Sequence, residues 1–294
     1  MVLIGRYCGE ESPGIYALCI SIVVFVSVLQ DRCLATSYMV FIHNKLPDER
    51  GRFLGSTLVH LGLTTLAACV ALAGYAGWLA ARGARPEMAQ AVLVLTVAAP
   101  SFLLRDFLRS VAFAHMQMIS ALTGDAIVFV IQIGALATLA WTGLLDVPAV
   151  FAWMGLATAA SCVAWAVAKP LPVALDRGRL AADWHEHWGY SRWLVAGRLA
   201  GNFSRFAMPW IVVWLADVAT VSQLSVCSTL VGISWLFIRG VTNYLRPLTI
   251  GAYAHGGAGP MLRVMWQGIG LFVVTLGTIA VALWFVGGWL LATV

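Results

Sequence analysis

Arginine and asparagine side chains recur at helical spacing inside stretches of sequence that are otherwise apolar. Arg198, Asn202 and Arg205 follow an i, i+4, i+7 pattern, which places all three on one face of a helix. Arg105 and Arg109 share a face of an earlier segment in the same way. The planar guanidinium group donates paired hydrogen bonds to phosphate oxygens. These residues therefore predict a cationic, water-accessible cavity that suits an anionic headgroup such as a diphosphate.

The depth of these side chains is informative because a charge in the hydrocarbon costs about 2.5–3.5 kcal/mol on insertion scales. Arg205 follows Trp193 by about 18 Å along a helix, at a rise of 1.5 Å per residue, and lies near mid-membrane. Pro209 comes four residues later and frees the Arg205 carbonyl, as in helices that line a cavity. We favour a cavity for Arg198 and Arg205. Extension to the cytoplasmic interface is favoured for three others, Arg109, Arg239 and Arg246.

Other charged residues leave two interpretations open. Asp31 with Arg32, and Arg105 with Asp106, either face a substrate path or neutralise each other locally. A further pair, Asp125 and Gln132, lies seven residues apart and shares a helix face. The candidates for a substrate path are Asp31, Arg105, Arg109, Asp125, Arg198, Asn202 and Arg205.

The elements that must position these residues are membrane helices. The chain has 294 residues, of which 61% are hydrophobic and 11% charged, against about 25% charged in soluble domains. Apolar runs long enough to cross about 30 Å of hydrocarbon form helices, because a helix satisfies its own backbone hydrogen bonds. We expect an all-α, polytopic membrane protein with about eight transmembrane helices, over residues 14–41, 53–80, 91–114, 121–143, 148–168, 193–215, 221–243 and 262–289.

Catalysis and metal binding receive little support from the sequence. The six cysteines lie mostly in apolar segments without metal-ligand spacing, and no GxSxG, P-loop, HExxH or paired DxxxD motif is present. The net charge of +5 suits cytoplasmic loops and anionic lipid headgroups better than nucleic acid. His185-Glu186-His187 is interpreted as a solvated turn, because no further ligands accompany it. We expect neither an enzyme nor a bound cofactor.

Basic residues predict the orientation of the chain. Nine lysines and arginines fall in the loops around 43–52, 169–192 and 244–263, and three fall on the opposite side. The positive-inside bias therefore places these loops in the cytoplasm and both chain ends outside it. Because that arrangement is unusual without a signal peptide, it suggests that a first helix is missing.

An internal repeat agrees with this topology. A shift of 211 residues lays 53–80 on 262–289 and matches Arg52 with Arg263 and Trp78 with Trp289. Parallel repeats of this kind build transporters with a substrate path at the repeat interface. We expect an N-terminal lobe of five helices (1–168) that lacks its first helix, a cytoplasmic linker (169–192) and a partial C-terminal lobe of three helices (193–294).

Four stretches, 7–17, 29–38, 102–125 and 187–193, are similar in order to a known family. The chain resembles the polysaccharide-transport, O-antigen flippase-like branch of the multidrug/oligosaccharidyl-lipid/polysaccharide (MOP) exporter superfamily. The resemblance implies a partial two-lobe MOP/MATE-like transporter fold, truncated at both ends, in the bacterial cell inner membrane. It also implies translocation of an undecaprenyl-diphosphate-linked glycan for cell-surface polysaccharide or lipopolysaccharide biosynthesis. Such a protein works by alternating access and uses a coupling ion, H⁺ or Na⁺.

Three alternatives stay open. A drug/cation antiporter of the same superfamily would favour an acidic lumen, whereas the candidates here are mainly basic. A membrane prenyl- or glycosyltransferase would need paired carboxylates for a metal-bound diphosphate, a spacing that Asp31, Asp106 and Asp125 do not show. A structural membrane subunit would not need arginines within the membrane.

Overall fold

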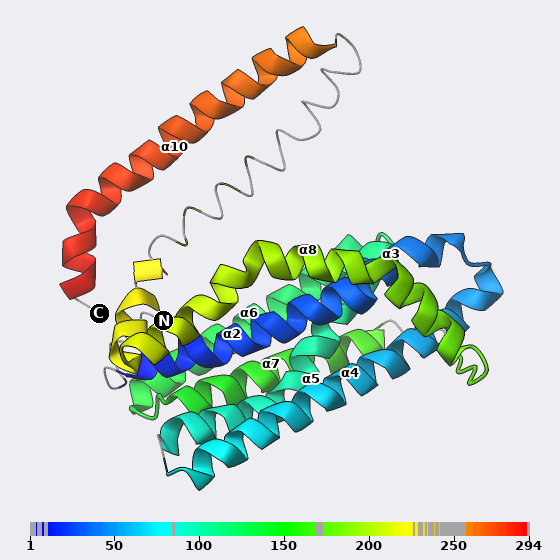
Figure 1. Ribbon diagram of the computed structural model, residues 1–294, viewed down its shortest axis with the longest axis horizontal. Coiled ribbons are helices and arrows are strands. Elements are labelled where there is room, and N and C mark those ends of the chain that lie inside the picture. Colours follow the sequence, from blue (N-terminus) through cyan, green and yellow to red (C-terminus); the bar gives the residue numbers. More distant parts are fainter. Residues whose placement is uncertain are drawn as a thin grey trace. The chain divides into compact units, whose positions relative to one another are not determined.

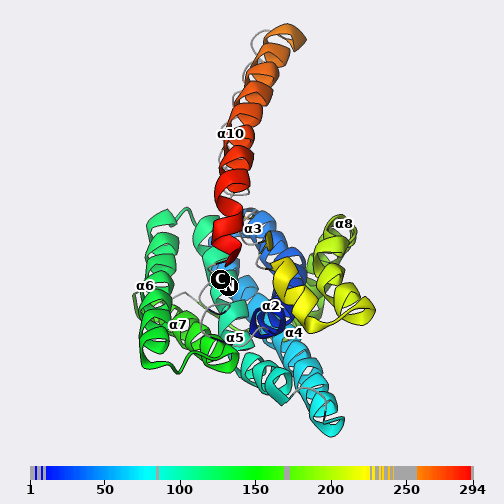
Figure 2. The ribbon, with the colours of Figure 1, turned by 90° about the vertical axis from the view of Figure 1, so that its left-hand side faces the viewer.

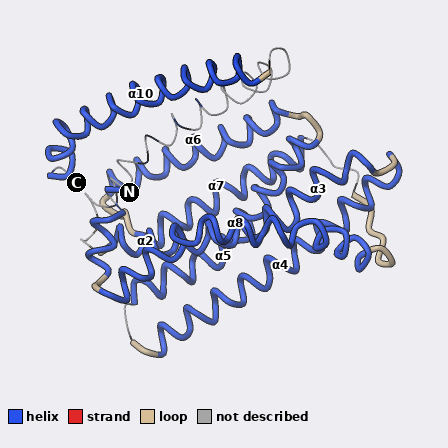
Figure 3. Tube along the Cα trace, turned by 45° about the horizontal axis from the view of Figure 1, so that its top comes forward, coloured by secondary structure: helices blue, strands red, loops and turns tan. Residues whose placement is uncertain are grey.

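The computed structural model describes the chain as a set of helices (Figure 1). The described residues are 4, 8, 11–83, 86–168, 173–225, 227, 228, 232, 234, 238, 241 and 257–292, and the side chains at 204–206, 282, 283 and 286–292 lie outside the description. Helices and short connections account for all of these residues, and Figure 3 shows no strand among them. The expected all-α class is confirmed for this part of the chain.

Two compact units make up the chain. The larger unit, 14–221, contains most of the described helices, and the other combines 1–13 with 222–294. The helices of the larger unit are α2 (Ser12–Gln30, whose first two residues belong to the other unit), η1 (Asp31–Ala35), α3 (Thr36–Phe41), η2 (Ile42–Asn44), α4 (Pro47–Ala81), α5 (Pro86–Ala114), α6 (Met118–Thr142), α7 (Val147–Ala168) and α8 (Leu180–Leu215). The smaller unit contains α10 (Ala258–Ala292).

Local sequence explains where several helices begin, end or change. Helix α4 starts on Pro47 with Asp48 and Glu49 in its first turn, as the fixed φ of proline and the helix dipole favour. Helix α6 ends at Gly143, whose φ of 69° is left-handed. In η1 the turn widens, and the Thr36 amide donates to the Asp31 carbonyl, five residues back.

Within the described residues, six helices are long and apolar enough to cross a membrane. They span Ser12–Asn44, Pro47–Ala81, Pro86–Ala114, Met118–Thr142, Val147–Ala168 and Ala258–Val281. These six correspond to six of the eight expected segments. The expected segment 193–215 is helical within α8, and the side chains at 204–206 in its middle lie outside the description. Most of 221–243 lies outside the described residues.

Helices α4, α5, α7 and α6 lie side by side in that order (Figure 2). Helix α2 contacts α5, where Gln30 Nε2 donates a hydrogen bond to the Leu103 carbonyl at 3.0 Å. Helix α8 packs on η1, α3 and α4. A core joins η1, α3, α4 and α5, and its largest side chains are Tyr38, Phe53 and Phe107.

Many large apolar side chains of these helices are exposed, including Leu66, Val97 and Phe129. Soluble proteins rarely expose contiguous apolar surface of this kind. Together with the six apolar helices, this exposure supports a membrane protein. The orientation and the two expected lobes stay predictions.

The polar stretch 169–192 differs from the expected linker. Residues 173–179 are non-helical, and the Ala174 amide donates to the Gly51 carbonyl at 3.0 Å. From Leu180 the chain is already part of α8. The interpretation of His185-Glu186-His187 as a solvated turn was wrong, because these residues are helical and His187 is 1% exposed. A buried histidine satisfies its nitrogens with neighbouring hydroxyl groups, which the local sequence does not reveal.

The contact between α5 and α7 depends on a glycine. A Cβ at Gly155 would lie 2.7 Å from the Cβ of Ala98, whereas a Cβ at Gly134 of α6 meets nothing within 4 Å. We expect Gly155→Ala to lower the unfolding temperature in detergent, at a cost of about 1–3 kcal/mol, because overpacking forces the helices apart. Gly134→Ala is the control. Unfolding would be measured by size-exclusion chromatography after heating. Equal unfolding temperatures for Gly155→Ala and Gly134→Ala would contradict this packing.

Candidate functional site

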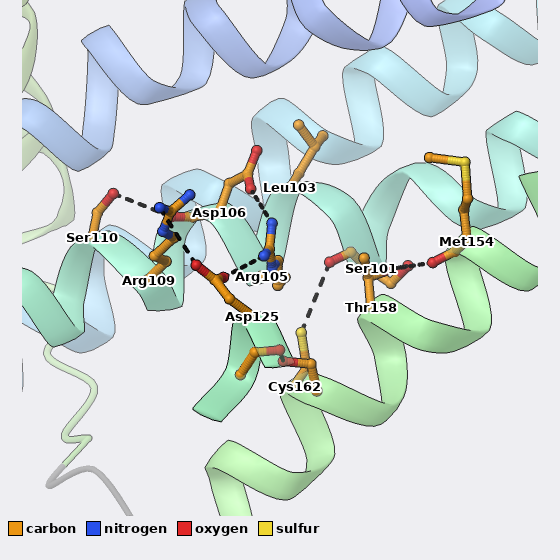
Figure 4. A network of polar contacts seen from close by, with 12 residues as sticks. Ser101, Leu103, Arg105, Asp106, Arg109, Ser110, Asp125, Met154, Thr158 and Cys162 are labelled. Carbon is orange, nitrogen blue, oxygen red and sulfur yellow. Dashed lines mark hydrogen bonds and ion pairs between the residues drawn. The ribbon is translucent and has the colours of Figure 1, made fainter. Parts of the chain in front are cut away.

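Two arginines on α5 share a carboxylate on α6 (Figure 4). Arg105 and Arg109 lie one turn apart, and both contact Asp125. Nη2 of Arg105 pairs with Oδ1 of Asp125, and Nη2 of Arg109 lies 3.4 Å from Oδ2. Nη1 of Arg105 also lies 3.3 Å from Oδ1 of Asp106. The structure thus joins three of the candidate residues in one network.

The connection between α5 and α6 explains this meeting. Only residues 115–117 separate the two helices, so the chain folds back tightly and brings Asp125 level with the turn that carries Arg105 and Arg109. Helical spacing put the two arginines on one face, as expected. The shared carboxylate was missed, although the short connection between two apolar runs is a signal that could have indicated it.

Hydroxyl groups fix α7 against its neighbours around the network. Ser101 on α5 donates to the Gly155 carbonyl at 3.0 Å and lies 2.8 Å from the Thr158 hydroxyl. Ser161 donates to the Gly124 carbonyl of α6 at 3.1 Å. These serines and threonines were not among the candidates, because small polar residues in apolar runs also pack as ordinary core.

A proline inside α5 adds a further link. Pro100 has no N–H, so the carbonyl of Thr96 loses its helical donor. The thiol of Cys69 on α4 lies 3.5 Å from that carbonyl and can donate to it. The carbonyl that Pro100 leaves without a helical donor thereby forms a contact between α5 and α4. This contact lies on the N-terminal side of Arg105 in α5.

A cavity of about 430 Å³ opens beside the network, within the roughly 300–1,000 Å³ typical of ligand pockets. Its wall comes from α2, α5, α6 and α7, and its polar lining is Ser27, Arg105, Asp106, Asp125, Gln132 and Thr158. The predicted common face of Asp125 and Gln132 is confirmed, because both line this cavity. A second space of about 20 Å³, the size of one water molecule, also has Arg105 and Asp125 in its wall. The Arg105–Asp125 pair therefore borders both spaces.

The charges of this region balance. Asp31 and Arg32, at the start of η1, form their own pair at 3.3 Å, and the charge of Asp31 acts on Asp106. Three arginines, Arg32, Arg105 and Arg109, therefore accompany three carboxylates. Asp31 pairs with Arg32, and Arg105 pairs with Asp106, so both pairs of adjacent residues neutralise charge locally. The described site is formally neutral where the sequence indicated a mainly basic one.

The side chains stay accessible. Arg105 is 22% exposed and Asp125 34% exposed, so both are partly buried while they face the cavity. Arg109, for which the interface was the favoured position, is 45% exposed and also lies over the Phe113 ring, 5.4 Å from its centroid. An anion that enters the cavity can thus reach the guanidinium group of Arg105 without unfolding the helices.

The candidates on α8 are placed differently. Arg198 is exposed, and Asn202 donates to the Arg198 carbonyl at 2.9 Å. Among the described residues, no hydrogen bond or ion pair links either one to Asp125, Arg105 or Arg109. The side chain of Arg205 lies outside the described residues, as do Arg239 and Arg246.

A metal site finds no support in the described part of the chain. No group of three or more histidine, cysteine, aspartate or glutamate residues is arranged to hold an ion there. The partners of Arg105 and Arg109 are carboxylates of the protein itself. The arrangement can bind and release an anion by exchanging one partner of an arginine for another.

The chain matches no protein-family model, no curated protein and no solved structure. The class of this protein therefore follows from its helices and from the charged site described above. Its described residues are helical apart from short connections and include six candidate membrane-spanning helices, and charged residues of α5 and α6 meet at a cavity wall.

Proposed function

We propose that the chain is a membrane transporter that flips lipid-linked oligosaccharide or polysaccharide precursors of the undecaprenyl-diphosphate type. The observation that carries the proposal is the pair of arginines on α5 that share Asp125 at the wall of the 430 Å³ cavity. The resemblance to the polysaccharide-transport branch of the MOP superfamily supplies the substrate class and the bacterial inner membrane.

The ion pairs suggest how such a substrate is held. A diphosphate offers several anionic oxygens, and guanidinium groups bind phosphate and carboxylate with the same fork geometry. The headgroup therefore replaces Asp125 as the partner of Arg105 and Arg109. Before the substrate enters, Asp106 and Asp125 together balance the charges of these arginines, so that the empty site avoids unpaired charge in the membrane. Ser27, Gln132 and Thr158 line the same cavity and can hydrogen-bond to sugar hydroxyls.

A second function has one observation in its favour. The neutral balance of the region, and Asp106 at the cavity wall, suit an organic cation better than a mainly basic lumen would. A drug/cation antiporter of the same superfamily is therefore the alternative. The two functions differ in the sign of the charge that the cavity accepts.

Reconstitution tests the two functions directly. Proteoliposomes would contain undecaprenyl-diphosphate-linked N-acetylglucosamine, and a soluble galactosyltransferase added outside would label only sugars in the outer leaflet. We expect the labelled fraction to exceed the half that is labelled in protein-free vesicles. A parallel assay would follow ethidium uptake. Ethidium uptake without a rise in labelling would favour the antiporter, and no change with either probe would contradict transport.

A further inference from the structure

The first half of α8 docks on α3 and α4 through a buried histidine. His187 is 1% exposed, and its Nδ1 lies 2.7 Å from the Ser37 hydroxyl of α3. Its Nε2 lies 3.1 Å from the Thr57 hydroxyl of α4, and its ring stacks on Phe53 with centroids 5.1 Å apart. One side chain of α8 thus contacts two helices, α3 and α4, that lie 150 and 130 residues earlier in the chain at the contacting residues.

The hydrogen atoms at this contact can be counted. The Ser37 hydroxyl lies 2.8 Å from the Cys33 carbonyl, and the Thr57 hydroxyl lies 2.7 Å from the Phe53 carbonyl. A neutral His187 donates from one nitrogen to one hydroxyl and accepts from the other hydroxyl, which turns away from its carbonyl. The ring is thereby satisfied without a charge. Burial, with His60 and Lys45 nearby, lowers the pKa of His187 to about 4.

A second pair of buried groups lies next to it. His60 on α4 is 6% exposed and Asp183 on α8 is 2% exposed. Nδ1 of His60 and Oδ2 of Asp183 both lack a hydrogen-bond partner. The His60 ring lies 5.2 Å from that of Trp184 and 6.0 Å from that of His187. Buried polar atoms are rarely left without partners, so two in one cluster require an explanation.

The charges around Asp183 sum to zero without it, although Arg179 also interacts with Asp183. Lys45, in the loop before α4, pairs with Glu186 of α8 at 2.7 Å. Arg179, just before α8, pairs with Glu49 of α4 at 2.7 Å. Each of these pairs is neutral, and from η1 the cluster is faced by the Cys33 thiol, which contacts Ser191 of α8. The charge of Asp183 acts on His60, which also contacts the backbone of Leu180, so a proton on the buried His60 ring would balance the excess negative charge.

We propose that His60 binds a proton beside Asp183, and that this proton holds the first half of α8 against α3 and α4. With the proton bound, the charges of the cluster balance. When the pH rises and the proton leaves, the cluster keeps one negative charge in excess at a buried position, which disfavours the docked position of α8. In a transporter this proton is the coupling ion, a step that rests on the proposed function.

The proton site can be observed without any transported substrate. The full chain, labelled with ¹⁵N-histidine in lipid nanodiscs, would be titrated by NMR, with the His60 signals assigned by their loss in His60→Gln. We expect the His60 signals to titrate with a single midpoint, with His60 protonated on the acidic side and neutral on the basic side. Asp183→Asn should lower that midpoint by about one pH unit or more. Asp176→Asn, an aspartate of the segment before α8, is the matched control.

Two results would overturn the proton site. One is a wild-type His60 that stays neutral down to pH 5, and the other is a midpoint that Asp183→Asn leaves unchanged. The wild-type titration decides the question even where Asp183→Asn does not fold, and the His187 signals report whether that variant is folded.

Coupling is tested separately in proteoliposomes with a pH gradient. We expect labelling of the undecaprenyl-diphosphate-linked N-acetylglucosamine to depend on the gradient in the wild type and to lose that dependence in His60→Gln. Unchanged gradient dependence in His60→Gln would overturn the coupling role and leave the flippase proposal standing. Failure of the wild type to move the probe under any gradient would overturn the flippase proposal and, with it, the coupling role, whereas the proton site would still be decided by the titration.

Discussion

Replacing Asp125 by asparagine is expected to tighten the binding of undecaprenyl-diphosphate-linked N-acetylglucosamine and to slow its transport. The carboxylate competes with the diphosphate for Arg105 and Arg109. Asparagine is nearly isosteric but uncharged, so the competition disappears and release becomes harder. We expect the Kd to fall by about tenfold, which corresponds to about 1.4 kcal/mol. Binding would be measured with the purified protein in nanodiscs, and transport by the galactosyltransferase assay.

Replacing Arg105 by glutamine should have the opposite effect on binding. The probe loses one guanidinium partner, so that its Kd should rise about tenfold or more while transport also falls. Arg82→Gln is the control, because Arg82 lies over the Trp78 ring at the end of α4, away from the cavity lining. A purely structural ion pair would make Asp125→Asn and Arg105→Gln equally unstable and change binding in neither. That outcome would contradict the partner exchange.

The stability of the protein should fall as the pH is lowered from about 6.5 to 4, and much of this loss should disappear in His187→Gln. The pKa of His187 is lowered from 6.5 to about 4, mainly by burial. Between these values an unfolded chain binds a proton at this histidine and the folded protein does not. Folding is therefore favoured fully above pH 6.5, and the advantage is lost as the pH falls toward 4. The difference amounts to roughly 3 kcal/mol.

The matched control for this prediction lies two residues away. His185 is exposed on the same turn of α8, so His185→Gln should keep the pH dependence of the wild type. His187→Gln should be less stable at pH 7, because the contacts with Ser37 and Thr57 are disturbed. Samples would be heated at each pH and returned to neutral pH, and the folded fraction would be measured by size-exclusion chromatography. Equal slopes for His185→Gln and His187→Gln would contradict the assignment.

Apolar run length predicted most of the helices, because about 20 apolar residues are needed to cross the hydrocarbon. Six of the expected segments match helices that meet that criterion. Helical spacing also predicted the shared faces of Arg105 with Arg109 and of Asp125 with Gln132. The first turns of α8 were harder to predict, because polar residues such as His187 are common both in solvated loops and in buried helix contacts.

The pairing of side chains could not be predicted in the same way. His187 meets Ser37 across 150 residues, and nothing in the local sequence of either identifies the partner. Arg105 and Asp125 are much nearer, and only the three-residue connection between their helices brings them level. Charge counts over whole segments therefore indicated a basic cavity, whereas the contacts are arranged so that each arginine has a carboxylate.

The wide turn of η1 sets the rotational phase of the first helix. In an uninterrupted α-helix two residues seven apart lie within about 20° of the same direction. Gln30 and Ser37 are seven apart but serve different neighbours, since Gln30 bonds to α5 and Ser37 contacts His187 of α8. The extra residue taken up between Asp31 and Ala35 separates these directions. Deleting one residue there would turn α2 and α3 relative to each other by about 100°, so the helix would lose its register with one of the two neighbours.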